Sequence, residues 1–256
     1  MLNKIYPPII TIFSTVIIVA SILIVQGQTA KETSLQSSNK KQENDHSKFR
    51  DTFFFVEYSN QSFLEDVRKL RGKKYDYIQT LIPETTQDYQ EYSSLHWSTG
   101  LPALPIDKSQ VIVIGRLVNA QAHLSSEKKS VYTEFKIEVE KTYKNSNQEK
   151  FESGKYVIAE REGGVVRFPS GYKAWFAISG QQMPKIGTKY LFFLTHEFPL
   201  FGYQKQDLLL LTAYELKNGK VYPLDNPNGG THPISKVYRE KEELILFNDL
   251  ESALKP

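Results

Sequence analysis

The sequence predicts a mainly β protein whose antiparallel strands close into a small barrel or sandwich. Strand-like segments follow one another from residue 107 to about residue 225, and no helical repeat of useful length interrupts them. The Asn218-Gly219 pair lies between apolar flanks, where it favours the tight turn of a β-hairpin. We therefore expect one β-barrel domain over residues 107–225.

Residues 1–30 have the pattern of an export signal or a membrane anchor. One cation, Lys4, precedes an uncharged and mostly apolar stretch. Val25-Gln26-Gly27 offers small residues for a signal peptidase, while the apolar run approaches the length that spans a bilayer. A cleaved signal peptide and a retained anchor both place the remainder outside the cytoplasm, as a secreted or a membrane-anchored protein.

Two segments separate this N-terminus from the barrel. Residues 31–50 are mostly polar and lack aromatic side chains as far as Lys48, which predicts a flexible linker. Residues 51–106 form an N-terminal extension that we expect to pack on the barrel. It contains a capping box that predicts a short helix over residues 62–70 and a proline-containing strap at residues 97–105. A proline-rich ligand for a partner is the alternative interpretation of that strap.

The expected strands are rich in β-branched and aromatic residues and are separated by Gly, Asn or Pro. Gly115 interrupts the first strand, which predicts a bulge or a sharp bend at that residue. In chain order, the strands are SQVIVIGRLVNAQ, VYTEFKIEVEKTY, GKYVIAERE, YKAWFAISG, GTKYLFFLTHEF, DLLLLTAYEL and KVYPL.

The second of these strands carries three glutamates, Glu134, Glu138 and Glu140. Alternation places them with Lys136 on the face opposite the apolar residues of the strand. A catalytic acid needs burial to raise its pKa, and a lysine-containing outer face does not provide that burial. We therefore expect these glutamates to be solvated.

Residues 226–256 comprise a linker rich in Gly, Asn and Pro followed by a C-terminal helix over residues 235–254. Apolar residues recur near one face of this helix. A helix packed against the barrel and a helix offered to a partner or to a membrane surface both agree with this pattern.

Composition excludes several kinds of site. The 256 residues contain no cysteine, so disulfides, a thiolate nucleophile and a lipid-modified cysteine are absent. A formal net charge of +3 gives no electrostatic footprint for nucleic acid. Neither a phosphate-binding glycine loop with its lysine nor a dinucleotide fingerprint occurs, and the histidines have no ligand spacing. The sequence thus predicts no cofactor and no metal.

The candidate ligand-binding residues lie in the segment AEREGGVVRFPSG. They are Glu160, Arg161, Gly163, Gly164 and Arg167. Paired glycines let backbone amides approach a ligand, and two arginines can hold an anion or a sugar carboxylate. The alternative is a β-hairpin whose tight turn needs the two glycines and whose rim carries the charges.

The strands SQVIVIGRLV, VYTEFKIEVEKTYK, GTKYLFFL and LLLLTAYEL resemble the progression in netrin-like modules, which include the tissue inhibitors of metalloproteinases. This resemblance covers residues 107–216 and implies an antiparallel OB-like barrel. Those inhibitors act through an N-terminal cysteine that chelates the zinc of the protease. Because this chain has no cysteine, the resemblance does not extend to that mechanism.

Four motifs resemble a group of uncharacterised exported bacterial proteins. They are GLPALP at 100–105, VYTEF at 131–135, ERxGGxVRxPSG at 160–171 and GQxMPxxGxxYLFFL at 180–194. This likeness implies export and a single β domain, and it implies no particular activity.

These observations favour an exported or membrane-tethered, non-catalytic binding module. The expected partner is a protein or a cell-envelope glycan, with the membrane contacted through the N-terminal segment and no nucleic acid bound. The alternative is an extracytoplasmic hydrolase with a carboxylate site near Glu160 and Glu162.

Overall fold

The chain divides into two compact units, Met1–Asp51 and Thr52–Pro256. The computed structural model describes only parts of the second unit, namely residues 54–58, 71–76, 89–92, 98, 100–145, 150–196 and 208–255. The predictions for residues 1–30, 31–50 and 62–70 therefore lie outside the described residues. Among the residues that are described, no helix combines the length and apolarity needed to cross a membrane.

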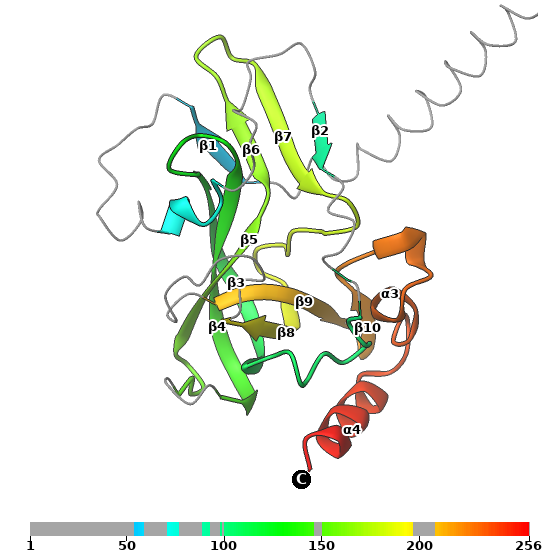
Figure 1. Ribbon diagram of the computed structural model, residues 1–256. Helices are drawn as coiled ribbons and strands as arrows, with labels where there is room; N and C mark the ends of the chain where they lie inside the picture. Colours follow the sequence, from blue (N-terminus) through cyan, green and yellow to red (C-terminus); the bar gives the residue numbers. More distant parts are fainter. Residues whose placement is uncertain are drawn as a thin grey trace, which may run out of the picture. The chain divides into compact units, whose positions relative to one another are not determined.

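The main sheet confirms a mainly β fold (Figure 1). Its six strands lie in the order β10-β9-β5-β4-β3-β8, and β8 also pairs with β9. The pairings therefore run around a ring of β3, β4, β5, β9 and β8. The ring does not close evenly, because β5 and β9 meet in parallel only at Ala159↔Leu208 and Glu160↔Leu209. The bounds are Val111–Leu124 for β3, Val131–Lys144 for β4, Tyr156–Glu162 for β5, Lys189–Thr195 for β8, Leu208–Lys217 for β9 and Lys220–Pro223 for β10.

A second sheet of four strands has the order β1-β6-β7-β2. Only β6 and β7 are antiparallel neighbours, since β1 pairs with β6 and β2 pairs with β7 in parallel. The segment YKAWFAISG was expected in the barrel and instead supplies β7 of this sheet, because the chain bends after β5 and leaves the ring. The bounds are Phe55–Glu57 for β1, Tyr89–Tyr92 for β2, Gly164–Arg167 for β6 and Lys173–Ile178 for β7.

Two predictions about backbone geometry are confirmed. Asn218 and Gly219 turn the chain between β9 and β10 with φ values of 53° and 74°, as the tight hairpin requires. The register of β3 against β4 shifts between Ile114 and Gly115. A Cβ at Gly115 would lie 2.5 Å from the carbonyl oxygen of Glu138, so only glycine fits this close approach.

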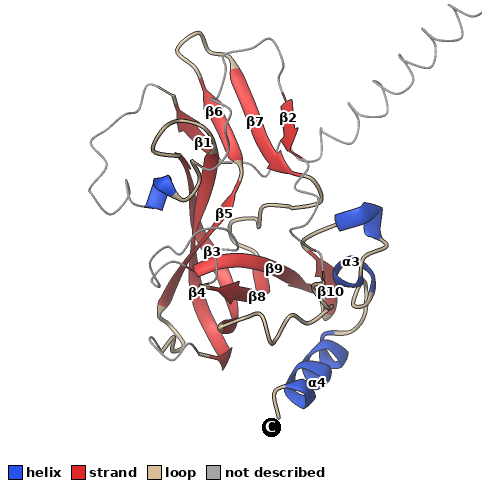
Figure 2. Cartoon of the chain, in the orientation of Figure 1, coloured by secondary structure: helices blue, strands red, loops and turns tan. Residues whose placement is uncertain are grey.

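The C-terminal helix packs on the barrel, but it begins later than expected. The described helices lie at the periphery of the sheets (Figure 2). The segment around residue 235 forms a short helix, α3 (Pro233–Lys236), and the long helix is α4 (Glu243–Ala253). Between them Glu240 has φ 61°, and its N–H donates to the Val221 carbonyl of β10. This edge pairing breaks the predicted helix over residues 235–254 in two.

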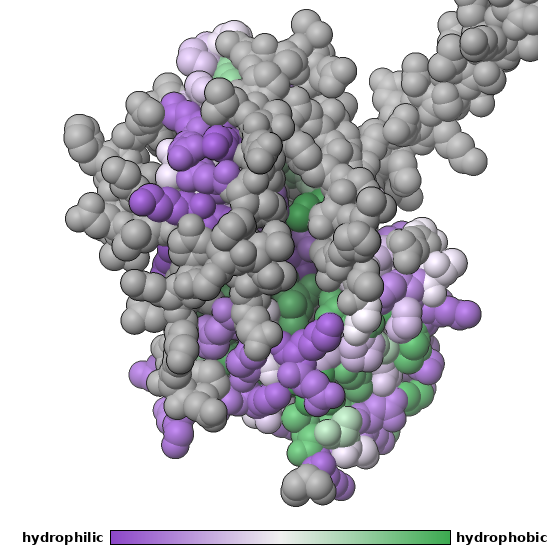
Figure 3. All heavy atoms as spheres, viewed as in Figure 1, coloured by the Kyte–Doolittle hydropathy of each residue, from purple (hydrophilic) through white to green (hydrophobic). Residues whose placement is uncertain are grey.

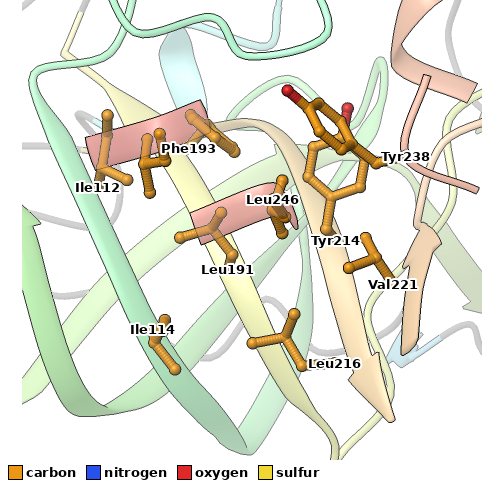
Figure 4. Packing of buried hydrophobic residues seen from close by; sticks show 10 residues of the cluster. Ile112, Ile114, Leu191, Phe193, Tyr214, Leu216, Val221, Tyr238 and Leu246 are labelled. Carbon is orange, nitrogen blue, oxygen red and sulfur yellow. The ribbon is translucent and has the colours of Figure 1, made fainter. Parts of the chain in front are cut away.

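A hydrophobic cluster joins α4 to the sheet (Figure 4). Leu246 and Leu250 of α4 are fully buried in it. The extension also contributes, since the Tyr214 hydroxyl donates to the carbonyl of Ala103 at 2.6 Å. The sheet residues of the cluster are Ile112, Ile114, Leu191, Phe193, Tyr214, Leu216 and Val221.

Candidate functional site

The five predicted site residues do not converge on one pocket. Alternation along β5 directs Glu160 to the outer face of the ring and Arg161 to its interior. Gly163 and Gly164 lie at the bend between the sheets, and Arg167 ends β6 on the surface. The five residues therefore lie in different environments and do not form one site.

Arg161 is a buried structural residue, 3% exposed. Its guanidinium forms a bidentate pair with Asp225 at 2.7 and 3.0 Å. The remaining N–H groups donate to the carbonyl oxygens of Gln182, Leu210 and Leu211. Because all five N–H donors are used inside the protein, Arg161 has none left for a ligand.

Glu160 belongs to a covered ion-pair cluster on the outer face of the ring. It pairs with Lys74, and the two side chains are 3% and 5% exposed. Across the ladder, Glu160 lies opposite Glu134, which contacts Arg71 at 3.2 Å and His123 at 3.5 Å. Residues 71–76 supply Arg71 and Lys74 to this cluster, and the Tyr75 ring stacks on the Tyr132 ring of β4 with 4.5 Å between centroids.

The cluster corrects the expectation that Glu134 is solvated. Its side chain is only 15% exposed, because residues 71–76 cover this part of the sheet. Burial by itself raises the pKa of Glu134, but the hydrogen bond to His123 and the charges of His123 and Arg71 outweigh it and lower the pKa to about 2. The outer face of β4 is thus exposed to solvent at Glu140 and covered at Glu134.

The geometry does not favour a hydrolase centred on Glu160 and Glu162. The two carboxylates share a face of β5, as alternation requires. Glu160, however, is inaccessible to a substrate and its charge is compensated by Lys74. An acid and base pair needs two carboxylates that can reach a bound substrate, and this arrangement offers at most one.

The two glycines form a bend between sheets, so the hairpin interpretation of this segment is wrong. β5 and β6 belong to different sheets, and the hairpin in this region joins β6 to β7. The N–H of Gly163 donates to Val131, and its carbonyl accepts from the Thr133 hydroxyl, both at 2.7 Å. A Cβ at Gly164 would lie 2.7 Å from Cγ1 of Val131. These glycines therefore allow the bend to pack closely against Val131 and Thr133 of β4.

Arg167 is the one predicted site residue whose side chain is well exposed, at 44%. Its guanidinium contacts Glu57 of β1 at 3.1 Å and lies 5.2 Å from the centre of the Phe55 ring. Lys173 approaches the same ring at 5.1 Å. An exposed pair of this kind adds little stability, and its charges largely cancel.

Tyr156 and Ile158 are two neighbouring surface residues of β5 that the sequence pattern did not single out. They are 51% and 44% exposed, large values for apolar side chains on a strand. The Lys136 ammonium lies 4.1 Å from the centre of the Tyr156 ring, and Lys136 is directly opposite Ile158 in the ladder. Alternation in KYVIAERE, with Val157 and Ala159 buried, is the signal that could have located them.

A second group of exposed apolar side chains lies near the C-terminus. Figure 3 shows hydrophobic side chains among hydrophilic ones over the surface formed by α3, β10 and α4. The exposed ones include Val237, Leu244 and Ile245. Acidic residues on either side, Glu240, Glu242 and Glu243, interrupt this group.

Neither a metal-ligand group nor a similarity to known proteins assigns a function to the described residues. Within the described part of the chain, no three His, Asp or Glu side chains are placed to hold a metal ion together. No protein family, curated protein or solved structure matches the chain. Only the geometry of the chain itself therefore bears on its function.

Proposed function

We propose that this protein is a non-catalytic module that binds another protein outside the cytoplasm. The observation that carries the proposal is the exposure of Tyr156 and Ile158 on the outer face of β5, beside Lys136 of β4. Aromatic side chains are enriched at the centre of protein interfaces, and a charged side chain such as Lys136 fits the polar rim around that centre. We call these three residues the β5 patch.

The chemistry of the β5 patch favours a protein over a glycan as partner. A sugar would stack on the Tyr156 ring, but the Lys136 ammonium already lies over that ring at 4.1 Å. Ile158 offers apolar area, which contributes to binding when it is covered by another apolar side chain. A cell-envelope glycan remains the competing partner and is distinguished by the experiment below.

The location outside the cytoplasm is supported by the N-terminal sequence. Under this proposal, residues 1–30 act as a signal peptide or membrane anchor and residues 31–50 as a tether. The likeness to exported bacterial proteins in four motifs agrees with the same location. The partner would accordingly be a protein of the cell envelope or of the medium.

We further propose that the ring is an OB-type barrel of the netrin-like kind. The pairing of β3 with both β4 and β8, the pairing of β8 with β9 and the short parallel contact of β5 with β9 support this assignment. An OB-fold is a five-stranded, partly open barrel that often binds ligands on the face of its second and third strands. In the ring these strands correspond to β4 and β5, which carry the β5 patch.

Site-specific crosslinking in the cells that make the protein tests this function. A photoreactive residue at position 158 of the full chain should capture a defined protein, and the Tyr156→Ala change should abolish that adduct. Ile186 provides the matched control, because it is also an exposed isoleucine, at 51%, and lies in the loop before β8. A photoreactive residue at position 186 should capture no such protein.

Two results would contradict the proposal. The first is an identical set of adducts from positions 158 and 186, which would indicate nonspecific contact. The second comes from complementation of a deletion strain: a folded Glu162→Gln variant fails to restore the wild-type phenotype, whereas Ile158→Lys restores it fully. Capture of polysaccharide instead of protein at position 158 would replace the protein partner by a glycan.

A further inference from the structure

Lys74 and Glu160 bring an amine and a carboxyl group into contact where water is excluded. Lys74 belongs to the segment of residues 71–76, and Glu160 lies on β5. Their side chains are 5% and 3% exposed, and the two charged groups meet directly. Because the two residues are far apart in the chain, only the fold brings them together. An ammonium and a carboxylate in contact are also the two reactants of an amide bond.

Contacts of the neighbouring residues hold the Lys74 amine in this position. The Tyr75 ring stacks on the Tyr132 ring, with 10° between the two planes. The Tyr75 carbonyl accepts from the Ser130 hydroxyl at 2.8 Å, and the Asp76 carboxylate accepts from the N–H of Glu127 at 2.8 Å. Two reacting groups held in this way behave as if they were very concentrated, because folding has already restricted their relative motion.

Burial favours the loss of both charges from this pair. Taking an ammonium and a carboxylate out of water has a desolvation cost, which their mutual attraction offsets only in part. Burial also favours the neutral form of each group. A proton passed from the Lys74 ammonium to the Glu160 carboxylate gives an amine and a carboxylic acid in contact. The neutral amine is the nucleophilic form of lysine.

Glu134 and Arg71 complete the surroundings of the pair. Glu134 lies opposite Glu160 in the ladder between β4 and β5, and it contacts Arg71 at 3.2 Å and His123 at 3.5 Å. A negative charge at Glu134 disfavours a second carboxylate beside it, and so favours the carboxylic acid form of Glu160. Loss of one cation and one anion from the cluster leaves Glu134 paired with Arg71, so no charge is left isolated.

We propose that folding joins Lys74 to Glu160 through an intramolecular isopeptide bond. Nζ of Lys74 attacks Cδ of the Glu160 carboxylic acid, so that the Nζ–Cδ bond forms and the bond from Cδ to the acid hydroxyl breaks. A proton from the nitrogen leaves with that hydroxyl as water. An ammonium and a carboxylate thus become one amide and one water, and no other reactant is consumed. The bond fastens residues 71–76 to β5 in a chain without cysteine, and it is independent of the proposed function.

Peptide mapping of the full chain, made by cell-free translation with detergent, detects the bond. Trypsin does not cleave after a lysine whose amine is acylated, so Lys74 should begin the peptide 74–108, while Glu160 is the only acidic side chain in the peptide 156–161. Mass spectrometry should find these two peptides joined, with a mass one water below their sum. Recovery of 75–108 and 156–161 only as separate peptides, from protein shown by circular dichroism to be folded, would overturn the proposal.

Two lysine variants locate the bond. Lys74→Arg keeps the positive charge but replaces the amine by a guanidinium that stays protonated, so the joined peptide should disappear. Lys73→Arg is the matched control, because Lys73 is the adjacent residue and is exposed, and it should leave the joined peptide in place. A joined peptide that persists in Lys74→Arg would overturn the proposal. The wild-type digest decides the question even where a variant fails to fold.

Thermal unfolding gives a second measurement. A covalent link between distant residues restricts the unfolded chain, so its loss in Lys74→Arg should lower the melting temperature by about 10 °C relative to Lys73→Arg. An ion pair alone would survive the exchange of lysine for arginine and would predict a much smaller shift. Equal melting temperatures for the two variants would therefore contradict a covalent link.

Discussion

At the scale of single residues, the burial of an ionisable group decides its role in this chain. Glu134, Glu160 and Arg161 are covered and paired, whereas Arg167 carries a similar ion pair in the solvent. Covered pairs must keep their partners, because an isolated buried charge is costly. The segment that looked most like a ligand loop therefore contains residues that hold the protein together.

The low pKa of Glu134 makes stability depend on pH. Its pKa is about 2 in the folded protein, against 4.5 for an unperturbed glutamate. The pairing therefore stabilises the fold fully above pH 4.5, and this contribution is lost as pH falls toward 2. The gap in unfolding free energy between wild type and Glu134→Gln should shrink over that range, from at most about 3 kcal/mol.

Urea unfolding between pH 7 and pH 2 measures this gap. Glu138→Gln is the control, since Glu138 lies on the same face of β4 and is not in the ion-pair cluster. A gap for Glu134→Gln that stays constant with pH, or that matches the gap for Glu138→Gln, would contradict the role assigned to the cluster.

At the scale of elements, each helix or strand is fixed by the surface that covers it. α4 is a short helix with one buried face, and isolated helices of this length are barely stable in water. Its position depends on Leu246 and Leu250, which are fully buried against β3, β8, β9 and β10. The other face of α4 remains in solvent.

Truncation of leucines in α4 distinguishes its two faces. Leu250→Ala removes a fully buried side chain and should lower the free energy of unfolding by about 2–5 kcal/mol. Leu244→Ala, at a side chain that is 65% exposed, should change it by less than about 0.5 kcal/mol. Denaturant unfolding followed by circular dichroism compares the two variants. Equal losses would mean that α4 does not pack in the manner described.

At the scale of the whole molecule, one buried side chain ties distant segments together. Arg161 of β5 bonds to the loop before β8 through Gln182, to β9 through Leu210 and Leu211, and to Asp225 after β10. Asp225 also accepts from the N–H of Gln182. In a chain without disulfides, this contact closes the ring where the backbone ladder between β5 and β9 ends.

Removal of the Arg161 guanidinium should therefore be severe. Arg161→Met leaves Asp225 buried without its counterion and should cost about 3–5 kcal/mol of unfolding free energy. Arg167→Met, which breaks an exposed pair in the next strand, should cost less than about 1 kcal/mol. Thermal and urea unfolding of both variants measure the difference. Similar losses would show that burial does not separate the two arginines.

The sequence by itself determined the β class, the Asn218-Gly219 hairpin, the irregularity at Gly115 and the presence of a C-terminal helix. These features follow from local preferences, namely period-two alternation, a dipeptide that accepts positive φ and a glycine where no side chain fits. Tertiary structure alone decided that β6 and β7 leave the ring, because the bend at Gly163 and Gly164 depends on the space beside Val131. It also decided that Glu160 and Arg161 are covered, since their partners Lys74 and Asp225 are far away in the chain. Whether a charged side chain meets water or a counterion depends on which distant segment covers it, and no local pattern encodes that contact.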